Sequence, residues 1–244
     1  MSGLLYKNWR QMFGNIMVIL TTQVVCSITT ILFAFFTSSG GELSNDNAAF
    51  ILFISAFMSF AIFFFIYLTY SDGLFAKDEK HSVTNFVISA PTGLAGQIRS
   101  KYYFIFAEFV AILFIQYITD VIVCGIVNNS AVSASMLLML IFSIMLIFTA
   151  VEIPFIVRFG SSHGIQVKGA VMAVIVLLIA IYFLFGDISI FDEPDILAAL
   201  QEKLTDAVTL GTTAVICAAA IPLYYLSYRI SVKLYMKGAE CYEN

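Results

Sequence analysis

Three carboxylic acids and one amide lie inside long apolar runs, where such side chains could carry protons or cations. They are Glu108, Gln116, Asp120 and Glu152. An acid within a membrane is costly to ionise, so it marks either a transport pathway or a carboxylate paired with a base. Glu108 and Glu152 lie near the ends of their runs, at the depth of Lys101 and Arg158. The sequence leaves pairing and pathway both open.

Catalytic and metal-binding patterns are absent from the sequence. It contains no GxxxxGK[ST], HExxH or GxSxG motif, its two histidines are isolated, and its four cysteines lack CxxC spacing. We therefore expect no catalytic residue, no metal site and no cofactor in this chain. Any energy for work must come from outside it, either from an ion gradient or from a separate ATPase.

The composition is that of a membrane protein. Of 244 residues, 61% are hydrophobic and 11% are charged, whereas soluble domains carry about 25% charged residues. Mean hydropathy is +0.96. So few charges could not cover a globular surface, which predicts an all-α polytopic membrane protein. No basic or acidic tail points to a nucleic-acid partner.

Six apolar runs are long enough to cross a bilayer as helices, which takes about 20 residues. The predicted spans are residues 16–36, 48–70, 103–127, 134–157, 169–185 and 207–228.

The basic residues predict the orientation of these spans. Under a six-span topology, eleven of the twelve lysines and arginines fall on one side, and only Lys203 falls on the other. Positive residues collect in cytoplasmic segments, so both termini are expected in the cytoplasm and the protein in the cell membrane.

Residues 1–15 form an amphipathic pattern before the first span. The apolar face carries Leu5, Trp9, Met12, Phe13 and Ile16. This favours a helix in the cytoplasmic interface, anchored by Trp9 and Arg10, with a simple aromatic belt as the alternative. Lys101 is expected at the lipid boundary as a third anchor, where a lysine can snorkel. A second amphipathic stretch, residues 186–206, predicts an extracellular loop that acts as a lid or gate.

The connection over residues 71–101 contains a short amphipathic helix. Ser82 can cap it, and Pro91 ends it. Its apolar face carries Val83, Phe86, Val87 and Ala90. Such a face outside the bilayer must bury against the membrane surface, the rest of the chain or a soluble partner. Thr92 can then cap the helix that leads into the third span.

This stretch resembles the exporter permeases of the ATP-binding-cassette (ABC) type-2 family. In that family an acidic residue, a short helix, a Pro-Ser/Thr turn and a lysine lead into the third span. The matching residues here are Glu79, 83–90, Pro91-Thr92 and Lys101. Gly93 departs from the pattern, since the family often has a basic residue there. The likeness extends over the whole chain in size and topology.

The resemblance implies a function and a set of partners. A nucleotide-binding ATPase subunit would hold ATP and Mg and contact Glu79, 83–90 and Pro91 as a coupling segment. A second permease, identical or a sister subunit, would complete the pathway. The small exporters of amphipathic peptides, such as the phenol-soluble modulin exporters, are similar in size. The residues leave two alternatives open: an ion-gradient-driven secondary transporter that uses the intramembrane carboxylates, and a passive membrane anchor.

Overall fold

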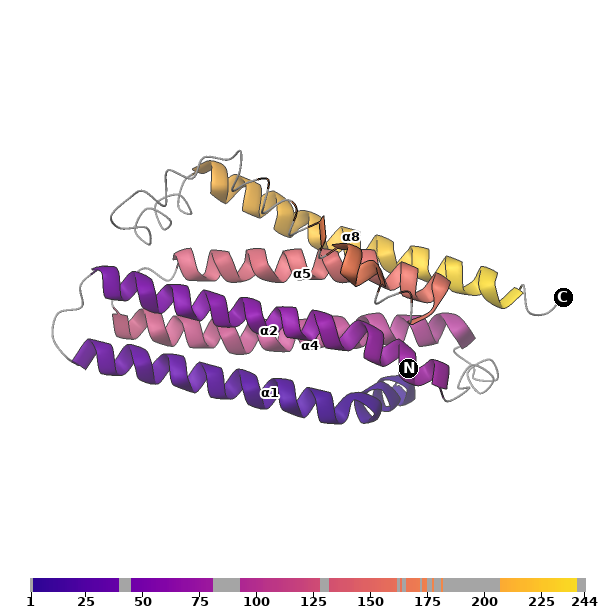
Figure 1. Ribbon diagram of the computed structural model, residues 1–244, viewed down its shortest axis with the longest axis horizontal. Helices are drawn as coiled ribbons and strands as arrows, with labels where there is room; N and C mark the ends of the chain where they lie inside the picture. The colour runs from indigo at the N-terminus through magenta and orange to yellow at the C-terminus, as the bar shows by residue number, and fades with distance from the viewer. Residues whose placement is uncertain are drawn as a thin grey trace.

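The computed structural model describes residues 2–39, 45–80, 93–127, 132–161, 163, 166–171, 173–174, 177, 181 and 207–240. Five long helices account for most of them. They are α1 (Ser2–Ser39), α2 (Asn45–Lys80), α4 (Gly93–Val127), α5 (Val132–Phe159) and α8 (Ala207–Glu240). The structure is an elongated helical bundle (Figure 1).

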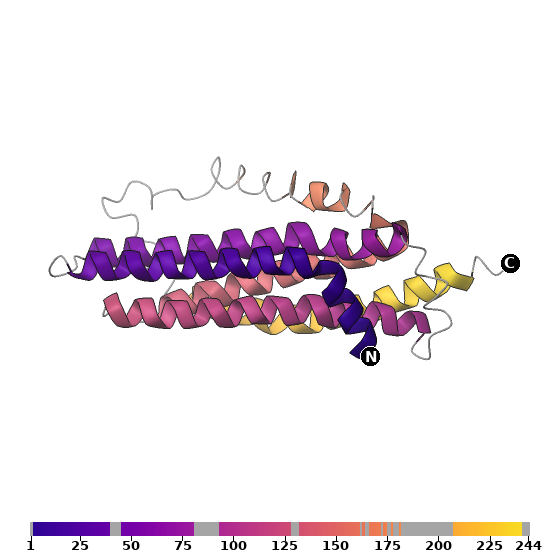
Figure 2. The same ribbon diagram turned by 90° about the horizontal axis from the view of Figure 1, so that it is seen from below.

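Helix α4 is the central element of this bundle, because it contacts each of the other four long helices. Helix α1 packs on α2 and α4, whereas α8 packs on α4 and α5. The two helices α1 and α8 therefore lie on opposite sides of the bundle (Figure 1). The N-terminal end of α4 lies at the same end of the bundle as the C-terminal end of α2 and the beginning of α1 (Figure 2).

Four of the helices are long and apolar enough to cross a membrane. These stretches are Gly3–Ser38, Ala95–Ile126, Leu137–Phe159 and Thr209–Met236. Helix α2 contributes the shorter apolar stretch Phe57–Tyr67 among the side chains that are described. The helices agree with the predicted spans 16–36, 103–127, 134–157 and 207–228. Most of the predicted span 169–185 and all of the loop 186–206 lie outside the described residues.

Residues 2–36 belong to one continuous helix, whose first turns bend away from its long axis (Figure 2), and the interfacial position of the N-terminal part stays a prediction. Residues 71–80, predicted as part of a connection, continue α2 to Lys80. They are helical because they bury side chains against the bundle: Leu74 is fully buried and Phe75 is 6% exposed. The connection is thereby reduced to residues 81–92.

Aromatic rings fill the centre of the bundle where α2, α4 and α5 meet. Phe63 stacks on Phe109 with ring centroids 5.9 Å apart, and Phe142 meets both rings edge-on. All three are buried. Interlocking rings of this kind fix how the helices are rotated against one another, since each ring fits only one gap.

Two prolines lie inside helices, Pro154 in α5 and Pro222 in α8, and neither one ends its helix. Helix α5 ends instead at Gly160, whose φ of 89° only glycine adopts readily. The Gly160 amide still donates to the carbonyl of Ile156 at 2.8 Å.

The outer surface of the bundle is apolar, as a lipid-facing surface must be. Phe36 is 71% exposed and Val215 is 68% exposed, and many other large hydrophobic side chains are similarly open. The interior, by contrast, contains serines, glutamines and acids that are almost completely buried. Polar groups inside and apolar groups outside are the distribution that a hydrocarbon environment favours.

The ring cluster can be tested with two phenylalanines of α2. Phe63→Ala should lower the free energy of unfolding by about 3–5 kcal/mol, because it leaves a cavity between three helices. Phe57, 59% exposed on the same helix, is the matched control, and Phe57→Ala should change stability little. Denaturant titration in detergent micelles measures both, and equal losses would contradict the packing described.

Candidate functional site

The carboxylate of Asp78, close to the end of α2, binds four side chains from two other helices. Lys7 of α1 places its Nζ 2.7 Å from Oδ1, and Gln11 Nε2 donates to the same oxygen at 3.0 Å. Lys101 of α4 places its Nζ 2.9 Å from Oδ2, and Gln97 Nε2 donates to that oxygen at 2.8 Å. Three helix ends therefore meet on one acid. We call these five residues the Asp78 cluster.

The predicted position of Lys101 at the lipid boundary is wrong, because this lysine lies between the helices. The side chain is 2% exposed, and its ammonium also donates to the carbonyl of Leu74 at 3.2 Å and lies 3.8 Å from the centre of the Phe75 ring. A buried ammonium is stable only with such partners. The nearby carboxylate of Asp78 therefore holds Lys101 between the helices. Trp9 and Arg10 are exposed on α1, and their role as interfacial anchors stays a prediction.

Two further contacts join the helices around the Asp78 cluster. Asn8 Nδ2 on α1 donates to Ser100 Oγ on α4 at 3.2 Å, and both residues are buried. On the other side, α1 and α2 approach closely at Gly73, where a Cβ atom would meet the Met12 methyl group at 3.3 Å. The absence of a side chain at Gly73 allows the fully buried Met12 to fit between the two helices.

The environment of Asp78 keeps it ionised. Burial alone would raise the pKa of this carboxyl, but the charge of Lys101 and the hydrogen bonds from Lys7, Lys101 and Gln11 outweigh that effect. The pKa of Asp78 therefore lies well below its usual range.

The Asp78 cluster lies at both ends of the predicted coupling segment. Asp78 precedes that segment, while Gln97 and Lys101 follow it. The predicted coupling residues Val83, Phe86, Val87, Ala90 and Pro91 lie outside the described residues. Glu79 is part of α2, but its side chain is not described. The structure thus describes the anchoring of the segment and leaves its docking face a prediction.

Sequence reasoning missed four members of this cluster: Lys7, Gln11, Asp78 and Gln97. A signal was present, since Lys7 and Gln11 are four residues apart and so are Gln97 and Lys101. Residues at this spacing lie on one face of a helix. One such pair lies on the first helix and the other on the helix that follows Asp78. Together they could have indicated that both pairs bind the same carboxylate.

A second polar network lies deeper in the bundle, between α1, α2 and α4. Gln23 Nε2 donates to Gln116 Oε1 at 2.7 Å, and Gln116 Nε2 donates to Ser55 Oγ at 3.0 Å. Asp120 accepts from Gln116 at 3.1 Å and from Ser55 Oγ. All four side chains are buried. The predicted pathway residues Gln116 and Asp120 thus belong to one network, which also joins three helices.

The other two predicted pathway residues lie apart from this network. Glu152 is fully buried in α5 and pairs with Lys168 at 3.3 Å, so its partner is not Arg158, which is exposed. The Lys168 ammonium also lies 5.2 Å from the centre of the Tyr67 ring. Glu108 is buried in α4. In the described part of the chain, no three His, Cys, Asp or Glu residues form a cluster that could hold a metal ion.

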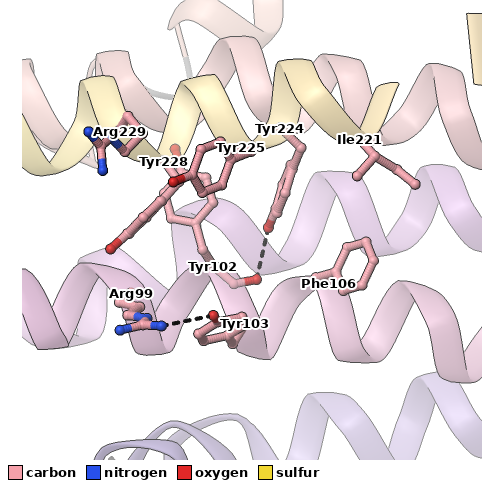
Figure 3. A pocket seen from close by; sticks show the side chains of 9 residues that line it. All are labelled: Arg99, Tyr102, Tyr103, Phe106, Ile221, Tyr224, Tyr225, Tyr228 and Arg229. Carbon is pink, nitrogen blue, oxygen red and sulfur yellow. Dashed lines mark hydrogen bonds between the residues drawn. The ribbon is translucent and has the colours of Figure 1, made fainter. Parts of the chain in front are cut away.

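Two clefts, among those that the described residues form, open on the outside of the bundle. One, of about 420 Å³, lies between α4 and α8 and is lined mainly by tyrosines with an arginine from each helix (Figure 3). The other, of about 490 Å³, lies between α5 and α8 and is almost wholly apolar; Pro154 and Phe155 are among its lining residues.

These helices define the chain as a multi-pass membrane protein. A family model described as "ABC-2 family transporter protein" matches residues 15–236, which is nearly the entire chain. The chain therefore belongs to the ABC-2 transporter family, and it is the membrane-spanning permease part of such a transporter. Among curated proteins, the comparison finds no match.

Removing the shared acid should destabilise the bundle. Asp78→Asn should cost about 3–5 kcal/mol, because two buried or half-buried ammonium groups lose their counter-charge. The triple variant Lys7→Gln, Asp78→Asn, Lys101→Met removes all three charges and should recover much of that loss. Denaturant titration in micelles measures both. A single variant as stable as the wild type would show that the carboxylate does not hold the helices together.

The stabilisation by Asp78 should also depend on pH. Its pKa is depressed in the folded protein, so its contribution is fully present above the unfolded value of about 3.9 and is lost as pH falls toward the folded value. The difference in stability between wild type and Asp78→Asn should be constant from about pH 5 to about pH 8, all of it above the unfolded pKa, and should shrink below about pH 4. If this stability difference already decreases as the pH is lowered from 8 to 6, another titratable group controls the cluster.

Proposed function

We propose that this chain is the transmembrane subunit of an ATP-driven exporter, coupled to a separate ATPase subunit through residues 81–92. The single observation that supports this coupling best is the Asp78 cluster. It joins the helix that enters the segment, the helix that leaves it and the first helix of the chain. A force applied to the segment therefore reaches three helices together.

The proposed docking surface is the apolar face of Val83, Phe86, Val87 and Ala90, with Glu79 and Pro91 at its borders. In this proposal the face buries in a groove of the ATPase subunit, which binds ATP and Mg and supplies the hydrolysis that this chain lacks. Family members of this class typically act with an ATPase subunit. A second permease, identical or a sister subunit, would complete the translocation pathway between the two membrane subunits.

The proposal places six spans in the cell membrane with both termini in the cytoplasm. The distribution of lysines and arginines supports this orientation. The geometry agrees, since the beginning of α1, the end of α2 and the beginning of α4 lie at one end of the bundle and carry the Asp78 cluster (Figure 2). That end is the one to which a cytoplasmic ATPase would bind.

The proposed substrate is a hydrophobic or amphipathic molecule, and small cytolytic or antimicrobial-type peptides are the class we favour. Support comes from the size of the chain, its resemblance to the phenol-soluble modulin exporters and its aromatic surfaces. A pathway for such peptides needs wide apolar walls with few fixed polar contacts. In this proposal, exposed phenylalanines of α2 such as Phe57 and Phe60 face the second permease instead of lipid and provide walls of this kind.

A second candidate function is transport driven by an ion gradient. The observation that favours it is Asp120, a buried acid that accepts hydrogen bonds from Ser55 and Gln116. An acid in that position could bind and release a proton. This function requires no ATPase and predicts transport by the isolated chain.

The coupling proposal is tested on the apolar face. Phe86→Asp combined with Val87→Asp should abolish co-purification of the ATPase subunit and substrate-stimulated ATP hydrolysis, because two charges would have to be buried in the groove. The matched control is Asn85→Asp, which adds a charge on the opposite face of the same predicted helix and should leave both unchanged.

Two outcomes would contradict this proposal. If the double variant still binds the ATPase subunit and transports substrate fully, Phe86 and Val87 do not form the docking surface. Transport by the purified chain alone in proteoliposomes, driven by a proton gradient without ATP and lost in Asp120→Asn, would establish the second candidate instead.

A further inference from the structure

We infer that the cleft between α4 and α8 is a binding site for an anionic membrane lipid, with the phosphate between Arg99 and Arg229. Figure 3 shows these two arginines on facing helices, with tyrosine side chains between them. Nothing in the proposed transport function requires this site. The inference rests on the shape, the chemistry and the position of the cleft.

The floor of the cleft is held in place by hydrogen bonds between three helices. Ser227 of α8 donates to the carbonyl of Ala150 on α5, so the hydroxyl of Tyr102 on α4 donates to Ser227, 2.7 Å away. The same hydroxyl lies 2.8 Å from Ser231 Oγ. Tyr224 OH donates to the carbonyl of Tyr102 at 2.9 Å (Figure 3). A floor fixed in this way presents a preformed surface to a ligand.

The walls of the cleft are aromatic. The Tyr102 ring meets Tyr224 edge-on with centroids 5.1 Å apart and meets Tyr228 in the same way at 5.6 Å. Phe106 adds another ring 5.9 Å from Tyr224. Aromatic faces with hydroxyl groups at their edges suit the region where a lipid changes from acyl chain to headgroup.

The opening of the cleft carries positive charge, and no acid among the described residues neutralises it. Arg99 and Arg229 are both exposed. Arg99 uses one N–H on the hydroxyl of Tyr103, at 3.2 Å, and its guanidinium lies 5.4 Å from the centre of that ring. Neither arginine forms a salt bridge with any carboxylate that the structure describes. A guanidinium has five donors in a plane, so most remain for the oxygens of a phosphate.

The position of the cleft favours a lipid over a water-soluble anion or a transported peptide. Both of its helices are candidate membrane spans, and it opens on their outer surface, where Ile221 and Tyr225 are more than half exposed. Arg99 lies near the beginning of α4, at the bundle end that carries the Asp78 cluster. Acyl chains thus cover the cleft's apolar side, while a headgroup at the end of the spans reaches the arginines.

The probe for this site is phosphatidylglycerol, with phosphatidylcholine as the zwitterionic reference. The purified full-length chain is mixed with each lipid in micelles, and bound lipid is counted by native mass spectrometry. Thermal stability is measured on the same samples, since a ligand that binds the folded chain raises its Tm. We expect wild type to bind phosphatidylglycerol in preference and to gain stability from it.

The variant Arg99→Gln with Arg229→Gln should weaken phosphatidylglycerol binding about tenfold and lose the gain in Tm, since each arginine near a membrane surface contributes to anionic-lipid affinity. Lys233→Gln is the matched control: it removes an exposed cation of α8 that does not line the cleft, and it should bind as wild type does. Arg99→Lys with Arg229→Lys keeps the charge and should bind with intermediate affinity, because ammonium lacks the planar fork.

Three outcomes would overturn the inference. The first is equal binding of both lipids by wild type. The second is an equal loss in the glutamine double variant and in Lys233→Gln, which would indicate general surface charge. The third is arginine-dependent binding of inorganic phosphate or of an amphipathic peptide with no preference for phosphatidylglycerol. None of these measurements uses an ATPase subunit, so their failure is independent of the proposed coupling.

Discussion

The shared carboxylate of Asp78 determines how α1, α2 and α4 meet. Lipid tails are as apolar as leucine side chains, so hydrophobic burial alone gives three membrane helices little reason to stay in one register. Charges leave no such freedom: Lys7 and Lys101 reach opposite oxygens of one acid at 2.7 and 2.9 Å. Sliding any helix by one turn, about 5.4 Å, would leave an ammonium or a carboxylate buried without its partner. The electrostatic contact thereby fixes a register that packing can then refine.

The same three helices are joined a second time by the network of Gln23, Ser55, Gln116 and Asp120. Two polar contacts at different depths make α1, α2 and α4 one unit that resists both sliding and splaying. Helix α8 is attached differently, through the neutral hydroxyls of Ser227 and Ser231 to Tyr102, and without a charged pair among the described residues. Neutral hydrogen bonds cost less to break than an ion cluster.

The sequence predicted the class of protein well and its contacts poorly. Apolar runs are long and continuous, so the helices over residues 103–127 and 207–228 and their membrane character followed from hydropathy. The end of α2 could not be predicted from hydropathy, because residues 71–80 are polar by composition but bury Leu74 and Asp78 in the bundle. The position of Lys101 was predicted wrongly for the same reason. A lysine at a span end has two favourable environments, and only the tertiary position of an acid from another helix decides between them.

The proposed coupling depends on how the segment 81–92 is anchored. The chain leaves α2 at Lys80 and returns in α4 at Gly93, and Gln97 Nε2 contacts Asp78 Oδ2 at 2.8 Å. Both ends of the segment are thus held at one point. A partner that binds only one end could bend a single helix, whereas this arrangement makes α2 and α4 respond together, and α1 with them through Lys7. The force that the segment can transmit to the helices is limited by the strength of the Asp78 cluster. A larger force would break the cluster and separate the helices instead of moving them together. A carboxylate held by two ammonium groups and two amides suits that requirement better than packing alone.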